Sequence, residues 1–238
     1  MIVAHRGASI DAPENTLEAF RLAWLQNADA IEGDFRLTKD GQIVCIHDED
    51  TSRTCGEKMI VAESTYVELS QLDASAHFKG DLATQSIPLL SEVFKTITNN
   101  KGIYIEIKCG PEIVPNLINL IIDSDLRKEQ ISIIAFDNQV IKAIKSIAPH
   151  IKAFWLYDVN EPVSIYELLD TLEDIKADGL GSNNTSSKEL VNSISKAGFE
   201  YHSWTIDDSQ VAEQLLKWGA ASITTNQPSY LRQQLSSN

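Results

Sequence analysis

Residues 131–156 read ISIIAFDNQVIKAIKSIAPHIKAFWL, and this stretch decides the fold class. It begins with the β-branched run Ile131–Phe136 and ends with a second apolar run, Ala153–Leu156, each of a length typical of a buried strand. Between these runs, Asp137 can cap a helix whose apolar side chains recur at helical spacing at Val140, Ile144 and Ile147. A strand, a helix and a second strand in this order predict a parallel sheet with covering helices.

The same alternation of strand and helix patterns continues along the whole chain. The other strand candidates are Ile2–Ala4, Ala30–Arg36, Gln42–Ile46, Ile103–Ile107, Gly179–Gly181, Tyr201–Ile206 and Ser222–Thr225. The chain has 238 residues, which is close to the ~250 residues of one α/β barrel. We therefore predict an α/β fold, a TIM (β/α)8 barrel, in which residues 1–238 form a single domain.

One part of the chain breaks this alternation. The runs Ala30–Arg36 and Gln42–Ile46 are joined by the turn Thr38–Gly41, so we expect them to pair as a hairpin. Approximately residues 49–86 show no rhythm of strands and helices. We interpret this segment as a small insertion after the second strand of the barrel.

The sequence also indicates where several helices begin or end. Asn15, with Glu18 three residues later, has the pattern of a capping box, so we expect the first helix to begin there. Gly198 and Gly219 each follow an amphipathic stretch, and glycine is favoured directly after the last turn of a helix. These signals predict one helix start and two helix ends.

The charge balance excludes two classes of protein. The chain has 20 Lys and Arg side chains and 34 Asp and Glu side chains, which gives a formal net charge of −14 at pH 7. A nonspecific nucleic-acid binder needs a basic face, and recruitment to anionic membranes by bulk charge needs a basic surface as well. Because no window approaches the ~18 consecutive apolar residues of a membrane helix, we also expect no stable membrane insertion.

Three cysteines, Cys45, Cys55 and Cys109, bear on the cellular compartment. Their odd number and their spacing fit neither a disulfide framework nor a zinc site, so we expect free thiols in a reducing compartment. The opening residues MIVAHRG lack the basic and apolar regions of a signal peptide. We therefore expect a cytoplasmic protein, with a periplasmic or secreted location as the alternative if a signal peptide has been removed.

His5, Arg6 and Gly7 directly follow the first strand candidate. In an α/β barrel this is the end of the strand at which active sites lie. His5 could transfer protons, Arg6 could hold a phosphate by paired hydrogen bonds, and Gly7 would let the chain turn sharply. A surface or structural role is the alternative for a His–Arg dipeptide taken alone.

Glu32 and Asp34 alternate along the second strand candidate and therefore point to the same face. Two neighbouring carboxylates inside a barrel repel each other unless one is protonated or a cation lies between them. Ligand sets made only of oxygen favour Mg²⁺ or Ca²⁺ over zinc. The alternative is a pair of strand charges that face solvent at the edge of a sheet.

Other candidate residues lie near the ends of later strands. His47 offers a second proton-transfer group at the same rim, although a capping or hydrogen-bonded histidine is the alternative. Glu106 and Lys108 share one face of their strand, where they could be a metal ligand and a phosphate clamp, or only a salt bridge. Trp204 could line a small-molecule pocket or pack in the core, and His202, at the same parity, could face the barrel interior.

Together these motifs resemble the glycerophosphodiester phosphodiesterase family, in its bacterial, cytosolic-type form. The resemblance spans nearly the whole chain and includes, in family order, His5-Arg6-Gly7, Ala12-Pro13-Glu14-Asn15-Thr16, Glu32-x-Asp34, Thr38-Lys39-Asp40-Gly41, His47-Asp48, Arg53-Thr54, Ile87-Pro88-Leu89, Glu106-x-Lys108 and Trp204-Thr205. Several separate motifs in one order are far more specific than any one of them. The resemblance implies a TIM barrel with a small insertion after the second strand.

The resemblance also implies a reaction. It implies metal-dependent hydrolysis of small-molecule glycerophosphodiesters, such as glycerophosphocholine or glycerophosphoethanolamine, to sn-glycerol 3-phosphate and an alcohol. His5 and His47 would be the general base and the general acid, in an order that the sequence does not assign. Arg6 would bind the phosphate and stabilise the charge that develops on it.

The family resemblance further implies a metal site and a substrate pocket. One divalent cation, Mg²⁺ or Ca²⁺, would be held by the carboxylates of Glu32, Asp34 and Glu106. Lys108 would add positive charge at the phosphate, and Trp204 would line the glycerol side of the pocket. Positive charge at these positions offsets the phosphate charge that otherwise repels an incoming nucleophile.

Two other functions stay open. The same fold could release a cyclic phosphate or act on lysophospholipids, which would require an apolar entrance for an acyl chain. The insertion carries only scattered apolar residues, such as Met59, Ile60, Val61 and Phe78. A barrel that binds phosphorylated metabolites without turnover is disfavoured, because both histidines and all three carboxylates are present.

Four positions depart from the family pattern without removing a candidate site residue. Gly33 stands between the two carboxylates where an apolar residue is usual, and Ala135 stands where Ser is usual. Asp207 stands where the family usually has Asn, and Asn226 where it usually has Asp. Beyond a small-molecule substrate, the sequence has no motif for a partner protein and does not indicate the oligomeric state.

Overall fold

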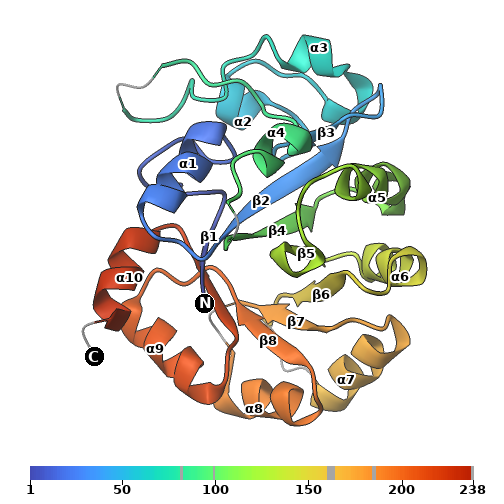
Figure 1. Ribbon diagram of the computed structural model, residues 1–238, viewed down its shortest axis with the longest axis vertical. Coiled ribbons are helices and arrows are strands. Elements are labelled where there is room, and N and C mark those ends of the chain that lie inside the picture. The colour runs from blue at the N-terminus through green and yellow to red at the C-terminus, as the bar shows by residue number, and fades with distance from the viewer. Residues whose placement is uncertain (81–82, 99, 160–163, 184–185, 237–238) are drawn as a thin grey trace.

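The computed structural model describes residues 1–80, 83–98, 100–159, 164–183 and 186–236. Within these residues the chain forms a nine-stranded sheet that closes on itself, because β1 pairs with both β2 and β9. Figure 1 shows the strands at the centre of the molecule and the helices around them. The predicted TIM barrel is therefore confirmed.

Eight of the nine strands run parallel to their neighbours and make the barrel. They are β1 (Ile2–Ala4), β2 (Ala30–Leu37), β4 (Gly102–Ile107), β5 (Ile131–Ala135), β6 (Lys152–Tyr157), β7 (Gly179–Ser182), β8 (Glu200–Ser203) and β9 (Ser222–Thr225). The ninth strand, β3 (Ile43–Cys45), pairs antiparallel with β2, which confirms the predicted hairpin. The predicted strand Tyr201–Ile206 is too long, since β8 ends at Ser203.

Helices cover the outside of the barrel. They are α1 (Leu17–Leu25), α4 (Leu90–Phe94), α5 (Val114–Ile122), α6 (Asn138–Ile147), α7 (Ile165–Asp174), α8 (Lys188–Lys196), α9 (Ser209–Trp218) and α10 (Pro228–Ser236), with short 3₁₀ turns η2 (Pro111–Ile113) and η3 (Lys128–Gln130). In α6, the side chains of Val140, Ile141 and Ile144 are buried, whereas Ile147 at its end is 57% exposed. This buried stripe is the apolar face that the helical spacing predicts.

The helix boundaries agree with most of the signals in the sequence. Asp137 caps α6, as predicted, by accepting a hydrogen bond from the backbone N–H of Gln139. Gly198 and Gly219 adopt positive φ angles at the ends of α8 and α9, also as predicted. The predicted start at Asn15 is wrong, because Thr16 is the N-cap of α1. The side chain of Asn15 instead contacts the candidate site described below.

The described part of residues 49–86 packs beside the β2–β3 hairpin. Their described part contains α2 (Ser52–Cys55), η1 (Val61–Glu63) and α3 (Tyr66–Leu69). Figure 1 shows α2 and α3 next to β3, on one side of the barrel. Their apolar side chains form a small cluster with the hairpin that is separate from the main core: Val44, Ile46, Cys55, Val61, Leu69, Ala74 and Ile87. The segment without strand–helix rhythm thus has a small core of its own.

Apolar side chains fill part of the inside of the barrel. Its cluster consists of Val3, Ala30, Tyr104, Ile134, Phe154 and Leu156. Because strand side chains alternate, the inward position Ala30 on β2 places Glu32 and Asp34 inward at the carboxyl end of the same strand.

In the described part of the chain, every helix is too short or too polar to span a bilayer.

Candidate active site

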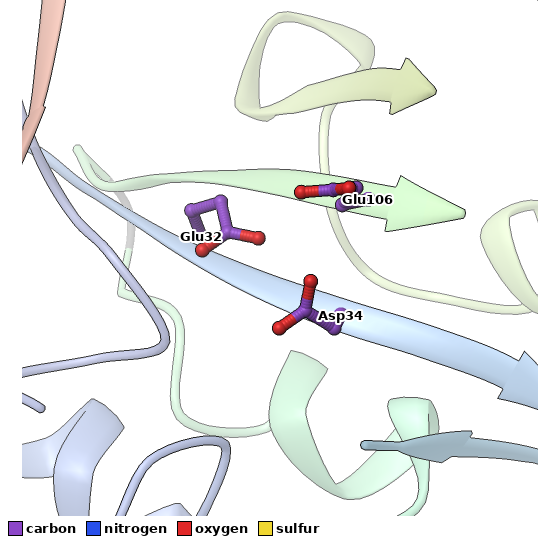
Figure 2. A group of neighbouring side chains, drawn as sticks. All are labelled: Glu32, Asp34 and Glu106. Carbon is purple, nitrogen blue, oxygen red and sulfur yellow. The ribbon is translucent and has the colours of Figure 1, made fainter. Parts of the chain in front are cut away.

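Three carboxylates converge inside the barrel near the carboxyl ends of β2 and β4 (Figure 2). Glu32 and Asp34 lie on β2, and Asp34 is the register partner of Glu106 on β4. One oxygen atom from each side chain lies within 4.8 Å of the other two. The three residues are only 1%, 0% and 7% exposed, so the structure brings the predicted metal ligands together in a buried cluster.

This cluster is electrostatically unfavourable unless positive charge or protons neutralise it. Burial raises the pKa of Glu32 well above its ordinary value, and the charges of Asp34 and Glu106 raise it further. Burial and then the Asp34 charge raise the pKa of Glu106 to about 7, although Lys108 opposes the effect.

The cluster also has unused hydrogen-bonding capacity. Among the described residues, no group donates a hydrogen bond to Glu32 Oε1 or Asp34 Oδ1, although both atoms are buried. Converging carboxylate oxygens without donors are the ligands that hard divalent cations bind. The residues present therefore fit the implied metal.

The loop after β1 directs His5 and Arg6 toward these carboxylates. Arg6 and Gly7 have φ angles of +54° and +83°, and a Cβ atom on Gly7 would lie 2.6 Å from the backbone carbon of Ala19. Only glycine fits this turn. The turn brings the Arg6 backbone N–H to Glu32 Oε2, at 2.9 Å, and the Arg6 Nε atom to within 3.0 Å of Asp34 Oδ2.

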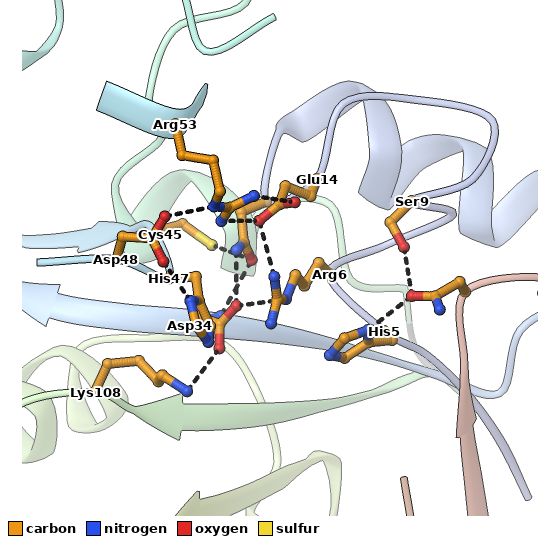
Figure 3. A network of polar contacts seen from close by, with 12 residues as sticks. His5, Arg6, Ser9, Glu14, Asp34, Cys45, His47, Asp48, Arg53 and Lys108 are labelled. Carbon is orange, nitrogen blue, oxygen red and sulfur yellow. Dashed lines mark hydrogen bonds and ion pairs between the residues drawn. The ribbon is translucent and has the colours of Figure 1, made fainter. Parts of the chain in front are cut away.

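Glu14 connects two arginines at the rim of the site (Figure 3). Arg6 Nη1 donates to Glu14 Oε1 at 3.0 Å, and Arg53 donates to both Glu14 oxygens at 2.8 and 2.7 Å. Burial acts to raise the pKa of Glu14, but the two guanidinium groups outweigh it and the pKa is lowered. Glu14 and Arg53 stand in the family motifs, but no role was predicted for either residue. Their contacts connect α2 to the loop after β1.

Asn15 holds Asp34 in place. Its Nδ2 group donates to Asp34 Oδ2 at 2.8 Å, and its Oδ1 atom accepts from the Asp34 backbone N–H at 3.1 Å. The Cys45 thiol also donates to this oxygen, at 3.2 Å. Asn15 has a φ angle of +58°, a conformation that asparagine tolerates better than most residues. The capping pattern in the sequence predicts only a helix start at Asn15 and does not indicate its contact with Asp34.

His5 and His47 line the same pocket. His5 Nδ1 lies 2.8 Å from Asn226 Oδ1, and its Nε2 atom lies 4.0 Å from Glu32 Oε2. Burial, followed by the charge of Arg6, lowers the pKa of His5. His47 Nδ1 lies 2.7 Å from Asp48 Oδ1, so the second histidine is oriented directly by a carboxylate.

Lys108, directly after β4, and Trp204, directly after β8, border the pocket. Lys108 Nζ donates to Glu106 Oε1 at 2.6 Å and lies 3.7 Å from Asp34 Oδ1. It also lies 5.6 Å from the centre of the Phe136 ring. Trp204 packs edge-on against that ring, with centroids 5.4 Å apart. Both predicted substrate-binding residues therefore border the same cavity.

His202 faces the barrel interior, as its parity suggested. Its Nδ1 atom lies 2.7 Å from Ser222 Oγ, and its ring centroid lies 4.2 Å from that of Phe154. Burial lowers the pKa of His202 to about 3, so the ring is uncharged at neutral pH. It forms part of the inner wall of the pocket.

The pocket has a volume of ≈ 270 Å³ and two chemically different sides. The ionic side includes His5, Arg6, Glu32, His47, Glu106 and Lys108, and Asp158 also lines the pocket. The apolar side consists of Tyr104, Ile134, Phe136, Phe154, Leu156 and Trp204. Such a cavity can bind a cation, hold an anion beside it and transfer protons, while an apolar wall contacts the rest of a small molecule.

Comparison of the sequence with known proteins identifies the family. The model of the "Glycerophosphoryl diester phosphodiesterase family" matches residues 5–230. A glycerophosphodiester phosphodiesterase from Caldanaerobacter subterraneus is 35% identical over 236 residues, which cover 97% of this chain and 96% of that protein. A glycerophosphodiester phosphodiesterase from Bacillus subtilis is 28% identical over 249 residues, with 96% and 84% coverage.

Solved structures agree with this result. An Oleispira antarctica phosphodiesterase in complex with the product sn-glycerol-3-phosphate has a TM-score of 0.87 and 25% identity, and the match covers 99% of this chain and 96% of that one. A glycerophosphodiester phosphodiesterase from Thermotoga maritima has a TM-score of 0.81 and 25% identity, with 98% and 96% coverage. The chain therefore belongs to the glycerophosphoryl diester phosphodiesterase family and is a phosphodiesterase.

Proposed function

We propose that the chain hydrolyses glycerophosphodiesters, such as glycerophosphocholine or glycerophosphoethanolamine, to sn-glycerol 3-phosphate and an alcohol. The observation that carries this proposal is the buried carboxylate cluster beside two histidines in one pocket. The product bound to the Oleispira antarctica relative supports a small phosphorylated substrate. We also propose that residues 1–238 act as a single catalytic domain with residues 49–86 as its insertion, and that the protein is cytoplasmic.

One divalent cation, Mg²⁺ or Ca²⁺, would be held by Glu32, Asp34 and Glu106. The bound cation would supply a Lewis acid and positive charge beside the phosphate. Lys108 and Arg6 already lie against these carboxylates, so both side chains stand where they can also contact the oxygens of a phosphate. Their fixed positive charge would stabilise the transition state more than the substrate.

The two histidines would divide the proton transfers. One would accept the proton of the attacking oxygen, and the other would donate a proton to the leaving alkoxide. His5 and His47 are held by different partners, Asn226 and Asp48, which keeps each ring in a fixed orientation. Trp204 would contact the glycerol portion of the substrate from the apolar side of the pocket.

A direct assay tests the reaction. The purified full-length protein would be incubated with glycerophosphocholine and either Mg²⁺ or Ca²⁺, with a chelator as the control, and released glycerol 3-phosphate would be measured. We expect product with at least one cation and none with the chelator. The proposal is wrong if no divalent cation supports release of glycerol 3-phosphate.

Variants test the proposed roles of the two histidines. His5→Ala and His47→Ala should each lose most turnover while the protein stays folded, because each removes a proton-transfer group. His150→Ala is the matched control, since this exposed histidine lies outside the pocket. Turnover near that of the wild type in either pocket variant would contradict the assignment.

A further variant tests the metal site. Glu106→Gln should raise the cation concentration that is needed for activity, because one of three carboxylate ligands is lost. If activity depends on cation concentration in the same way as in the wild type, Glu106 acts only as the partner of Lys108.

A further inference from the structure

Asp207 and Asn226 form a hydrogen-bonded pair behind His5. Asn226 Nδ2 donates to Asp207 Oδ2 at 2.7 Å. Asp207 Oδ1 accepts from the Asn226 backbone N–H at 2.8 Å and from the Thr225 hydroxyl at 2.7 Å. Asp207 follows β8 and Asn226 follows β9, so the pair joins the ends of two neighbouring strands. The roles proposed above do not involve Asp207.

The side-chain oxygen of Asn226 contacts His5 and Ser9. Its Oδ1 atom lies 2.8 Å from His5 Nδ1 and accepts from the Ser9 hydroxyl at 3.0 Å. Figure 3 labels His5 and Ser9 and marks these two contacts with dashed lines. A carboxylate only accepts hydrogen bonds, so the NH₂ group of the amide must face Asp207. The amide oxygen must then face His5, and this orientation follows from the network itself.

The orientation of the amide determines the tautomer of His5. Because the amide oxygen can only accept, the hydrogen atom must lie on His5 Nδ1. The other ring nitrogen, Nε2, faces the pocket, 4.0 Å from Glu32 Oε2. We propose that Asp207 and Asn226 are positioning residues that hold His5 in its Nδ1–H tautomer, with Nε2 directed at the substrate. Only the catalytic consequence of this inference rests on the proposed function.

His5 and His47 are thus oriented in different ways. His47 contacts the carboxylate of Asp48 directly. His5 contacts an amide, and the carboxylate of Asp207 acts on it through that amide. Asp207 therefore influences a ring that it does not touch.

Asp207→Asn should invert the tautomer. The oxygen of the new amide would keep the hydrogen bonds from Thr225 and from the backbone of Asn226, so its NH₂ group would face the NH₂ group of Asn226. Two donors cannot pair, and Asn226 would flip to relieve the conflict. Its NH₂ group would then donate to His5 Nδ1, which would force the hydrogen atom onto Nε2.

The reciprocal exchange should restore the original tautomer. In the Asp207→Asn/Asn226→Asp double variant, the amide at position 207 donates to a carboxylate at position 226, and that carboxylate accepts from His5 Nδ1–H and from Ser9. Asn226→Asp alone would place two carboxylates face to face and leave one of them without its donor. With the wild type, the three variants form a double-mutant cycle in which only the double variant again pairs one amide with one carboxylate and restores the Nδ1–H tautomer of His5.

The experiment reads the tautomer directly and does not depend on turnover. The ¹⁵N shifts of histidine-labelled wild-type protein would be recorded at one neutral pH, with the His5 signals assigned from a His5→Asn variant. Asp208→Asn is the matched control, because Asp208 caps α9 and asparagine is an equally good N-cap. We expect Nδ1–H in the wild type, the control and the double variant, and Nε2–H in Asp207→Asn.

Turnover provides the second readout. We expect Asp207→Asn to lower kcat by roughly 10- to 100-fold, the range typical when an outer partner of a metal-ligating side chain is changed. KM should stay the same, because the pocket contacts are retained, and the double variant should recover kcat. An Nε2–H tautomer in the wild type, or an Asp207→Asn variant that matches Asp208→Asn in tautomer and kcat, would overturn the inference. A wild-type protein without phosphodiesterase activity would refute the proposed function, while the wild-type spectrum would still test the tautomer.

Discussion

Ionised Glu106 should destabilise the protein when no metal is bound, and Glu106→Gln should therefore stabilise it. Burial and the Asp34 charge raise the pKa of Glu106 from its ordinary value of 4.5 to about 7. A pKa change of one corresponds to about 1.4 kcal/mol, so ionised Glu106 costs about 3 kcal/mol of folding free energy. The pKa of Glu106 is higher in the folded state than in the unfolded state. The stability contributed by protonated Glu106 is therefore fully present below about pH 4.5 and is lost as the pH rises through about 7.

Thermal unfolding in the presence of a chelator measures this cost. For a chain of this length, 1 kcal/mol corresponds to about 2–4 °C in Tm, so Glu106→Gln should melt roughly 6–12 °C above the wild type at pH values above 7. The two proteins should melt at similar temperatures below pH 4.5, where both side chains are uncharged. Glu129→Gln is the matched control, because the Glu129 side chain is 65% exposed. Parallel pH curves for the wild type and Glu106→Gln would refute the reasoning.

Thermal unfolding with added cation tests whether these carboxylates bind the metal. Mg²⁺ or Ca²⁺ should raise the Tm of the wild type most strongly above pH 7, because binding replaces protons on the carboxylates. The increase should be smaller in Glu106→Gln, which has lost one ligand. An equal increase in both proteins would mean that the cation binds elsewhere.

Contacts in the structure set the expected effects of three further substitutions on stability or cation binding. Gly7→Ala should destabilise the folded protein by at least about 2 kcal/mol in urea unfolding, because a Cβ atom at this left-handed position meets the backbone of α1. Asn15→Ala should weaken cation binding by roughly 10- to 100-fold in calorimetry, because it removes the amide that orients Asp34. Lys145→Met should cost about 2–3 kcal/mol in urea unfolding, because the Asp178 carboxylate and two backbone carbonyls each lose the hydrogen bond from the Lys145 ammonium group. Its cation binding should be unchanged, since these contacts lie at the opposite end of the barrel.

The barrel and the pairing of Glu32 with Asp34 could be predicted because both follow from local periodicity, whereas the addition of Glu106 to this pair was implied by the family resemblance. Alternation along a strand places Glu32 and Asp34 on one face whatever the rest of the chain does. The role of Asn15 could not be predicted in this way. The capping pattern of Asn15 and Glu18 is the same whether the asparagine caps a helix or bonds to Asp34. Only the position of β2 next to the loop after β1 decides between the two.

The contact between Asp207 and Asn226 could not be predicted from the sequence either. In the sequence, each residue is a separate departure from the family pattern, and 18 other positions lie between them. Because β8 and β9 are neighbours in the barrel, the two departures lie in direct contact at 2.7 Å. An exchange of Asp and Asn between positions 207 and 226 therefore accounts for both departures. The carboxylate is then separated from His5 by the side chain of Asn226. The sequence shows that the loops after β8 and β9 belong to consecutive units, but it does not show which side chains of the two loops meet.

The charges around the pocket explain why cation and substrate should bind together. The residues that contact one another there carry five negative charges and three positive charges, which leaves −2 when all are ionised: Glu14, Glu32, Asp34, Asp48 and Glu106 against Arg6, Arg53 and Lys108. A phosphate would meet net repulsion from this group, and a divalent cation would neutralise it.

Salt screens the remaining charge of the chain beyond about 8–10 Å, so this local balance decides binding. Calorimetry should show that glycerol 3-phosphate binds much more tightly in the presence of Mg²⁺ or Ca²⁺. Because such coupling is reciprocal, glycerol 3-phosphate should tighten cation binding by the same factor. Equal affinity for glycerol 3-phosphate with and without the cation would show that Arg6 and Lys108 alone hold the phosphate, and that the carboxylates do not need to be neutralised for the anion to bind.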